Sequence, residues 1–597
     1  MRNVRNTGGR KMKSYLDLVR IQSGYRRNEN RMTRLCIFLA VFLVTVIFGM
    51  ADMEIRTQKV QTILSGGGWH GVFGEITPEQ MDLIASRPET DVAVRCAMLN
   101  SGLDQGYQIQ GTETGIFGIE ETFPELFPGF EITEGICPEN HRQAVITEKL
   151  GERLGKKTGD TVTVTLPDGT AWDFTICGMV GEASMLGDQE NMIFTTYSGC
   201  RSLGKAQGTA TEDSLFVSFF SRYNIQKTLE DIREKMDLKE EQVASNGRLL
   251  ALMLQSDDPY VLQIYMVAAI LALLVGLAGI FMIAGSLNSS TARRTEFFGM
   301  MRCLGATRKQ VSRLVKREAL GWCFRAVPAG IGLGCAVIWI LCAVLRILSP
   351  GIFEGMPLFG ISWIGIVCGG AGGFLTVLLA ARSPAKKASQ VTPQAAVSGN
   401  AGTVWQAKRA VRAGRTLRVE TALGVHHALG SKKNFLLMVL SFSFSILLFL
   451  AFSAVVDFLG FAIVPLQPYA PDIMVVIAMI AVFNIINSMA MSVSARTQQY
   501  GVMRAVGMSR KQLGRMIASE DWTYGIWGIL TGCAVGIPLN RFAFTLLVTD
   551  RWGEPWELPV CELAIIVLVV AASVAVSAAG PVRKLAGMSI VKNVNTE

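Results

Sequence analysis

Apolar residues are not spread evenly along this chain but fall into eight long blocks separated by polar segments. Each block has about 20 residues, the length that an α-helix needs to cross the hydrocarbon core of a bilayer. The first block follows 34 mostly polar residues and lacks a small-residue cleavage site, so we interpret it as a signal anchor rather than a cleaved signal peptide. We predict transmembrane helices at 35–53, 260–287, 320–346, 360–381, 434–456, 474–493, 521–546 and 561–580.

The longest polar stretch, residues 54–258, lies between the first and second blocks and predicts an α+β domain. Its segment "DTVTVTLPDGTAWDFTICGMV" (160–180) alternates apolar and polar positions on both sides of a turn sequence, which predicts a β-hairpin. The segment "NIQKTLEDIREKMDL" (224–238) has helical spacing. The fifth and sixth blocks are only about 17 residues apart, so the second half has no room for a matching domain.

Positive charge is concentrated in alternate loops. Ten Lys/Arg precede the first block, and the 2–3, 4–5 and 6–7 loops contain eight, ten and five. The opposite loops, 347–360, 457–473 and 547–560, contain only Arg551. Basic loops stay on the cytoplasmic side of membranes, so we predict that both termini are cytoplasmic and that the α+β domain is extracytoplasmic. This topology accounts for the formal net charge of +9, and we expect no nucleic-acid partner.

One cytoplasmic loop sequence occurs twice. "RTEFFGMMRCLGATRKQ" (294–310) and "RTQQYGVMRAVGMSRKQ" (496–512) are identical at nine of seventeen positions, at an offset of 202 residues. The same offset aligns Glu318 with Glu520, and Gly330 and Gly334 with Gly532 and Gly536. The chain is therefore predicted to contain two four-helix repeats. Because each has an even number of spans, both enter the membrane in the same direction and are parallel rather than inverted.

The predicted fold class is thus a polytopic α-helical membrane protein, with eight transmembrane helices in two parallel four-helix repeats and one α+β extracytoplasmic domain between helices 1 and 2. The predicted parts are an amphipathic cytoplasmic segment at 1–34, span 1 at 35–53, the extracytoplasmic domain at 54–258, the first permease domain at 259–397, a cytoplasmic linker with an amphipathic segment at 398–433, span 5 at 434–456, a short outer loop at 457–473 and the second permease domain at 474–590.

We call the two repeated loops the first elbow (294–310) and the second elbow (496–512). In the first, Gly305 suits the left-handed position that closes a helix, and Thr307 with Gln310 forms a capping box for the next helix. Gly507, Ser509 and Gln512 repeat these devices. The helix that follows each elbow has an apolar stripe among basic residues, which predicts an amphipathic helix at the cytoplasmic membrane surface. Similarity at loop positions favours a docking surface over a simple anchor between spans.

The spans themselves carry little transport chemistry. Glycines repeat every fourth residue at 330–334, 365–373 and 528–536, which favours close helix packing over ligand binding. Glu318 and Glu520 lie at the inner ends of spans 3 and 7, where we expect each to pair with an elbow arginine. No series of buried carboxylates marks an ion path, which argues against an ion-driven carrier.

No catalytic or metal site is evident. Cys96, Cys137, Cys177 and Cys200 of the outer domain allow three disulfide pairings or free thiols, and the sequence does not choose among them. "LSGGGWHG" (64–71) and "GERLGKKT" (151–158) superficially resemble nucleotide-binding sequences, but we interpret both as turns. His426 and His427 are adjacent on a predicted surface helix, so they point apart and make poor joint ligands.

The two elbow sequences resemble the cytoplasmic loop of FtsX-like permeases, the membrane subunits of ABC complexes that include macrolide exporters, lipoprotein-releasing transporters and bacitracin-resistance-type permeases. "SPAKKASQVTPQAAV" (383–397) is similar to the family's post-span tail, and "ALGVHHALGSKKNFLL" (422–437) to its amphipathic segment before a first span. "AVITEKLGERLGKKTGDTVTV" (144–164) is similar to its extracytoplasmic core domain. The missing second outer domain departs from duplicated relatives.

The resemblance implies a coupling role for both elbows, each facing one copy of a separate ABC ATPase. ATP and Mg²⁺ would then belong to the ATPase, and this chain would hold no cofactor and have no enzymatic activity of its own. The implied coupling residues are Gly299, Met301, Arg302, Gly305, Thr307 and Arg308 in the first elbow, and Gly501, Met503, Arg504, Gly507, Ser509 and Arg510 in the second.

The resemblance further implies a multi-pass protein of a bacterial cytoplasmic membrane, in contact with lipid, that moves its outer domain when the ATPase closes. Its outer partner would be a peptide, a lipid-linked compound, a lipoprotein or a cell-wall enzyme. The alternative is a sensor or scaffold that detects antimicrobial peptides or controls a cell-wall hydrolase. A secondary carrier is disfavoured by the parallel repeat. The sequence identifies neither the cargo nor the direction of its movement.

Overall fold

A computed structural model of the chain divides into two compact units, which are described separately. The helical unit comprises Met1–Met53, Gln263–Gly351 and Leu358–Glu597, and the α+β unit comprises Glu54–Leu262 and Ile352–Pro357. The structure describes residues 27–181, 191–221, 223–256, 260–292, 294–348, 353, 355–391, 418–430, 432–462, 474, 478–479, 481–482, 485, 500, 503–504 and 506–587.

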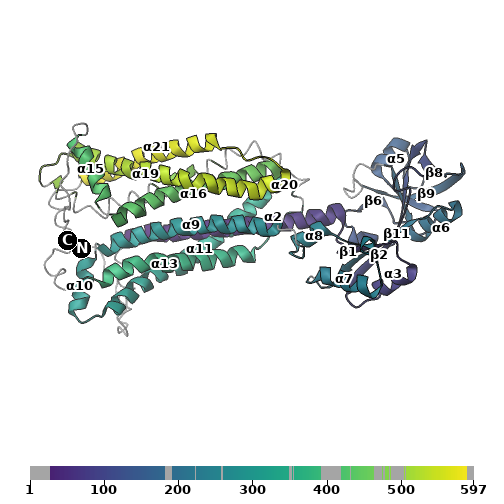
Figure 1. Ribbon diagram of the computed structural model, residues 1–597, viewed down its shortest axis with the longest axis horizontal. Helices are drawn as coiled ribbons and strands as arrows, with labels where there is room; N and C mark the ends of the chain where they lie inside the picture. Colours follow the sequence, from purple (N-terminus) through teal and green to yellow (C-terminus); the bar gives the residue numbers. More distant parts are fainter. Residues whose placement is uncertain are drawn as a thin grey trace. The chain divides into compact units, whose positions relative to one another are not determined.

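Long apolar helices make up the helical unit (Figure 1). Among the described residues, six helices are long and apolar enough to cross a membrane, and a shorter apolar stretch, Val560–Ala575, coincides with the eighth predicted span. The sixth predicted span, 474–493, falls mostly outside the described residues. The helices are α2 (Arg27–Gly66), α9 (Tyr260–Ala292), α10 (Thr295–Cys303), α11 (Arg308–Leu348), α13 (Trp363–Ser389), α15 (Val419–Leu429), α16 (Lys432–Ala462), α19 (Arg510–Phe544), the π-helical turn η5 (Thr545–Thr549), α20 (Asp550–Trp552) and α21 (Val560–Gly587).

Glycines bring the backbones of neighbouring helices into contact in the first half. A Cβ atom added at Gly330 of α11 would lie 2.9 Å from the carbonyl oxygen of Phe38 in α2. At Gly369 of α13 it would lie 2.1 Å from the hydroxyl oxygen of Thr45, also in α2. The small residues therefore serve packing, as predicted, because any larger side chain would push the helices apart.

The second half repeats this contact at corresponding positions. A Cβ atom added at Gly532 of α19 would lie 2.9 Å from Cβ of Ile446 in α16, and one at Gly536 would lie 2.7 Å from Leu450. These glycines correspond to Gly330 and Gly334, which approach Val41 and Thr45 of α2. Each half thus packs a corresponding pair of helices, α2 with α11 and α16 with α19, through corresponding glycines.

An extended mixed sheet forms the α+β unit. Twelve strands lie within its described residues, in the order β12-β1-β11-β2-β5-β10-β7-β9-β8-β3-β4, with β6 paired to β9. Most pairs are antiparallel, whereas β5–β10 and β7–β9 are parallel. The strands are β1 (Gly71–Gly74), β2 (Thr90–Leu99), β3 (Gln108–Ile109), β4 (Thr112–Glu113), β5 (Gly115–Ile119), β6 (Ile132–Gly135), β7 (Gln143–Thr147), β8 (Thr161–Thr165), β9 (Ala171–Val180), β10 (Met192–Thr196), β11 (Glu212–Phe219) and β12 (Val243–Ser245).

Short helices and turns complete this unit. The hairpin predicted at 160–180 is confirmed as β8 and β9, in which Thr163 faces Asp173 across the ladder. The helix predicted at 224–238 is confirmed as α7, and both nucleotide-like sequences lie at helix ends and turns, as expected. The helices are α3 (Pro78–Ala85), α4 (Phe123–Leu126), α5 (Glu148–Leu154), α6 (Tyr197–Gln207), α7 (Ile225–Lys235), the 3₁₀ turn η3 (Glu240–Gln242) and α8 (Gly247–Leu252).

The four cysteines of the α+β unit are free thiols. Cys96, Cys177 and Cys200 are buried, and Cys137 is partly exposed. Burial raises the pKa of the Cys177 thiol to about 11 and that of Cys200 to about 12, because a buried thiolate loses its hydration. Since the thiolate is the reactive form, these two side chains are chemically inert near neutral pH.

Maleimide labelling of the intact protein tests the thiol assignment. Among the four cysteines of the α+β unit, we expect Cys137 to react first at about pH 8, while Cys200 stays protected because its thiol is both buried and protonated. Raising the pH to about 9 should increase labelling of Cys137. It should not increase labelling of Cys200, because the pKa of this thiol, about 12, lies far above pH 9. In denaturant without reductant all four should react, and a pair that required reductant would instead reveal a disulfide.

Gly330 and Gly332 form a matched pair for testing the glycine contact. Gly330→Val places its side chain against the backbone of α2, and overpacking of this kind costs about 1–3 kcal/mol of stability. Gly332→Val is the control, since a Cβ atom there meets nothing within 4 Å. We expect a lower melting temperature of the purified protein for the first variant alone, and equal melting temperatures would contradict the packing role.

Candidate functional site

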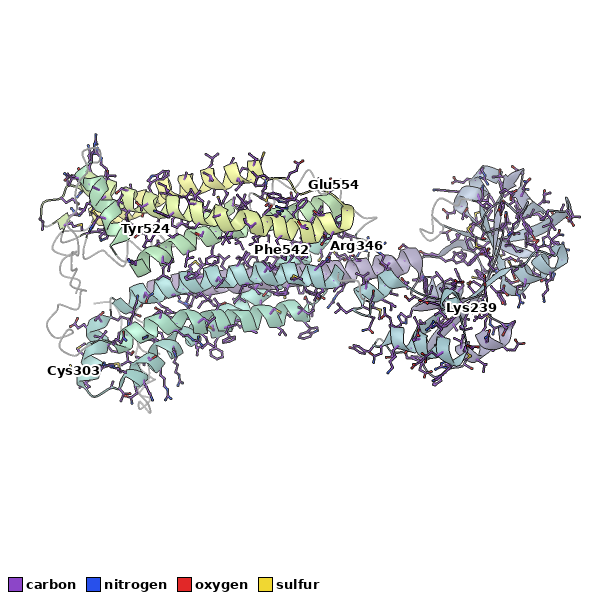
Figure 2. All side chains as sticks on the ribbon, in the orientation of Figure 1. Lys239, Cys303, Arg346, Tyr524, Phe542 and Glu554 are labelled. Atoms are coloured by element: carbon purple, nitrogen blue, oxygen red, sulfur yellow. The ribbon has the colours of Figure 1, made fainter. Side chains whose placement is uncertain are left out.

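α10, in the first elbow, and the start of α19, at the second elbow, lie at the same end of the helical unit (Figure 1). Figure 2 shows Cys303 of the first elbow at this end and Arg346 and Glu554 toward the opposite end. In the first elbow, α9 ends at Ala292, α10 runs from Thr295 to Cys303, and α11 begins at Arg308. Two helix ends and two helix starts therefore occur within about sixteen residues.

Gly305 closes α10 in the way the sequence predicted. Its φ is +94°, its amide donates to the Arg302 carbonyl at 3.1 Å, and the Ala306 amide donates to the Met301 carbonyl at 3.0 Å. This pair of bonds is the Schellman motif, which needs a left-handed residue and therefore favours glycine. A Cβ atom at Gly305 would meet nothing within 4 Å, so backbone conformation rather than space explains the glycine.

The second elbow has the same closure. Gly507 has a φ of +110°, its amide donates to the Arg504 carbonyl at 3.1 Å, and the Met508 amide donates to the Met503 carbonyl at 3.1 Å. Gly501 lies outside the described residues. The two loops thus form the same Schellman motif, with a left-handed glycine and the same pair of backbone hydrogen bonds.

Capping boxes start the following helix in both elbows, as predicted. The Thr307 amide donates to Gln310 Oε1 at 2.8 Å, and the Gln310 amide donates to Thr307 Oγ1 at 3.3 Å. The Ser509 amide donates to Gln512 Oε1 at 2.9 Å, and the Gln512 amide donates back to Ser509 Oγ at 3.3 Å. Each elbow is therefore fixed by local bonds on both sides of its glycine.

The apolar stripe after each elbow does not form a separate membrane-surface helix. Residues 308–348 form one continuous helix, α11, and residues 510–544 form α19, so each stripe belongs to the base of span 3 or span 7. Val311, Leu314 and Val315 are buried against Phe298 of α10 and the end of α13. The prediction was wrong on this point, because a capping box sets where a helix begins but not where it ends.

Some of the coupling residues implied by the resemblance point inward. Gly299 is buried, Met301 packs in the cluster around Phe298, and Arg302 Nη1 donates to the carbonyls of Ser389 at 3.0 Å and Val391 at 3.3 Å. Met503 packs in the matching cluster of the second elbow. These side chains hold α10 or its counterpart in place, whereas Gly305, Thr307, Arg308, Gly507, Ser509 and Arg510 are exposed.

The coupling residues implied by the resemblance do not include an exposed apolar side chain at the tip of each elbow. Leu304 is 88% exposed and Val506 is 85% exposed, the largest values among the exposed large apolar side chains. The two residues correspond at the 202-residue offset and directly precede Gly305 and Gly507. Exposed basic residues follow, Arg308 and Lys309 in one elbow and Arg510 and Lys511 in the other. An apolar tip beside positive charge is a surface suited to a protein partner.

Glu318, at the base of α11, pairs with an elbow arginine, as predicted. Arg294 Nη1 lies 2.7 Å from Glu318 Oε2, and both side chains are buried. The guanidinium also lies over the rings of Phe297 and Phe298. A buried ion pair of this kind is costly to break, because removing one partner leaves the other charge unsatisfied.

Glu520, the counterpart of Glu318 in α19, has described partners of a different type. His427 Nδ1 lies 2.9 Å from Glu520 Oε2, the Tyr524 hydroxyl donates to Oε1 at 2.9 Å, and the Tyr500 hydroxyl donates to Oε2 at 3.3 Å. His427 comes from α15 and is 7% exposed, so the prediction of a surface histidine was wrong for this residue. α15 is buried along the face that contacts α19.

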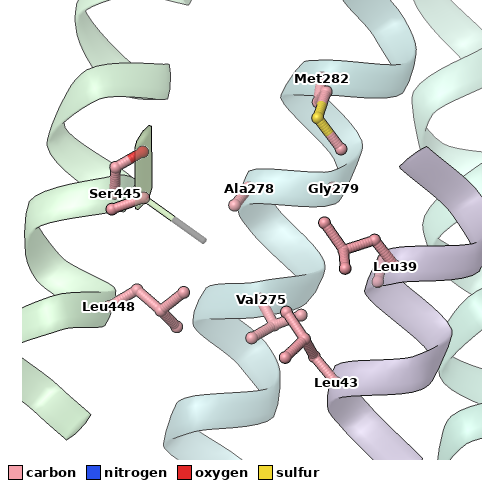
Figure 3. Close-up of a pocket in the computed structure, with 10 residues that line it drawn as sticks. Leu39, Leu43, Val275, Ala278, Gly279, Met282, Ser445 and Leu448 are labelled. Atoms are coloured by element: carbon pink, nitrogen blue, oxygen red, sulfur yellow. The ribbon is translucent and has the colours of Figure 1, made fainter. Parts of the chain in front are cut away.

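A small cavity of about 40 Å³ opens between helices of the two halves (Figure 3). Leu39 and Leu43 of α2, Val275 and Met282 of α9, and Leu448 of α16 contribute to its wall. None of the ten lining residues is charged. Among the described residues there is also no cluster of metal-ligating side chains.

Comparisons with known proteins identify two domain families that match parts of this chain. Residues 269–393 and 473–590 match the FtsX-like permease C-terminal domain, and residues 32–235 match the MacB-like periplasmic core domain. The first two ranges contain the two elbows. The chain therefore matches the former domain twice and the latter once.

One curated relative is the ABC transporter permease YtrF of Bacillus subtilis, 30% identical over 136 residues, which are 21% of this chain. The match spans 30% of the relative's own length. Among solved structures, the periplasmic region of MacB from Actinobacillus actinomycetemcomitans is 12% identical, with a TM-score of 0.25, over 34% of this chain and 99% of that one. A domain of a putative permease from Porphyromonas gingivalis is 15% identical, with a TM-score of 0.22, over 32% and 92%.

Substitution of Gly305 tests the closure of α10. Gly305→Val forces a branched residue into the left-handed region, at a cost of about 1–2 kcal/mol, whereas Gly305→Asn should cost less because asparagine tolerates that region. We expect faster amide hydrogen exchange at the end of α10 and the start of α11 in the valine variant. Gly321→Val in α11 is the control, since a Cβ atom there also meets nothing within 4 Å but φ is not positive. Unchanged exchange in Gly305→Val would contradict the motif.

Proposed function

We propose that this chain, an ABC transporter permease with two FtsX-like permease domains and one MacB-like periplasmic core domain, transmits ATP-driven motion from a separate ATPase to its α+β domain. The duplicated elbow supports this proposal most directly. Two loops with the same Schellman motif, the same capping box and the same exposed apolar tip offer two similar docking surfaces at one end of the helical unit.

Each elbow is packed firmly enough to pass a displacement on to the helix that follows it. Its outer side presents Leu304 or Val506 together with basic residues, and its inner side packs on the base of span 3 or span 7. Because α11 and α19 continue without a break from the elbow into the apolar span, displacement of an elbow moves the whole helix. We place two ATPase copies here, one at each elbow, with ATP and Mg²⁺ held by the ATPase.

The same mechanism places the elbows on the cytoplasmic side and the α+β domain outside. α2 continues from its apolar stretch to Gly66, at the start of that domain, so it provides a direct helical connection. The substrate class that suits such a mechanical device is a peptide, a lipid-linked compound or another hydrophobic molecule that the outer domain expels or extracts. No polar path through the spans is then required.

Charge placed at the two tips should separate this permease from its ATPase. We expect the double variant Leu304→Asp, Val506→Asp to lose co-purification with the ATPase by at least roughly 30-fold, since burying a hot-spot side chain contributes about 2 kcal/mol or more. Each single variant should lose less, because the other elbow remains. Leu304→Val and Val506→Leu should retain binding.

The control is Val419→Asp, since Val419 is an exposed apolar residue of α15 and lies outside both elbow sequences. This variant should co-purify normally. Wild-type recovery of the ATPase with the double variant would show that the elbows are not the docking surface.

A further inference from the structure

A buried carboxylate lies below each elbow, and the described partners of the two carboxylates differ. Glu318 pairs with Arg294, which belongs to the first elbow itself. Glu520 contacts His427, which belongs to α15 and lies 93 residues away in the sequence. The base of the second elbow is therefore fastened to a helix that precedes span 5.

The backbones of α15 and α19 also touch. A Cβ atom at Gly424 would lie 1.9 Å from Ser519 Oγ and 2.4 Å from the Met516 carbonyl oxygen. Ser519 Oγ in turn lies 3.3 Å from the carbonyl of Thr421, to which it donates. Such close approach leaves no room for a larger residue at position 424 and fixes the register of the two helices.

Apolar packing extends this contact to the elbow. Leu423 of α15 packs with Tyr500, Leu513, Met516 and Ile517, and the same cluster includes Met503 and Met508. Met503 and Met508 provide the carbonyl and the amide of one bond of the Schellman motif that closes the second elbow. Movement of α15 would thus disturb the residues that shape this turn.

We propose that His427 is a positioning residue of the second elbow and that α15 is a clamp that holds the base of this elbow in place. This proposal depends on the proposed function only in treating the second elbow as a coupling element. Without the imidazole, the buried Glu520 loses one of its partners, and the base of α19 is free to shift.

Spin labelling of the full-length permease without its ATPase tests this clamp. A nitroxide is attached at Leu304→Cys or at Val506→Cys, in a background in which the accessible Cys137, Cys303 and Cys561 are serine. We expect His427→Ala to shorten the rotational correlation time of the label at 506 at least twofold and to leave the label at 304 unchanged. His427→Gln, whose amide can still donate to Glu520, should restore the wild-type spectrum at 506.

Gly424→Ala is a second variant that leaves the imidazole in place, and it should also loosen the label at 506 by displacing α15. Val419→Ser, on the exposed side of α15, is the control and should change neither label. An unchanged spectrum at 506 in both His427→Ala and Gly424→Ala, or equal loosening at 304 and 506, would overturn the proposal. Because the ATPase is absent, failure of ATPase docking would leave this result interpretable.

Discussion

Backbone contact between helices at glycine faces is the constraint on which the helical unit depends. In lipid, apolar side chains gain little by leaving the solvent, so helices associate where small residues let their backbones approach. Gly330 and Gly369 approach α2, and Gly532 and Gly536 approach α16. Each half is thereby a firmly packed group of helices. Only a helix held in this way can carry a displacement from its end into the bundle.

Local chemistry explains why the elbows could be predicted from sequence. Gly305, Thr307 and Gln310 act on neighbours within five residues, and the hydrogen bonds they make follow from residue type and spacing alone. The hairpin at β8 and β9 is equally local. The glycine faces were predictable for a different reason, since a repeat of four residues places them on one side of a helix.

Tertiary context explains what the sequence could not supply. Leu304 follows Met300 and Met301 and looks like one more apolar helix residue, yet it lies beyond the last turn of α10 and projects outward. His427 sits in a short helix with no strong polar face, and its burial depends on α19, far away in the sequence. The apolar stripes after the elbows were assigned to the membrane surface because their partners, Phe298 and the end of α13, are not sequence neighbours. In each case the pattern identified the helix but not the surface it would meet.

Because the chain has one α+β domain but two elbows, the paths from the two elbows to that domain are unequal. The α+β domain is inserted between α2 and α9, both in the first half, whereas the second half lacks such an insertion. If both elbows drive this single domain, a displacement of the second must first cross to the first half. The described route is an apolar interface in which Leu447 and Ala451 of α16, with Ala543 of α19, pack against Val44 of α2 and Leu271 of α9. Packed side chains transmit displacement because they cannot be compressed. Under the proposed mechanism, the second elbow acts through an interface that the first does not need, and the α15 clamp holds the start of the longer of the two paths.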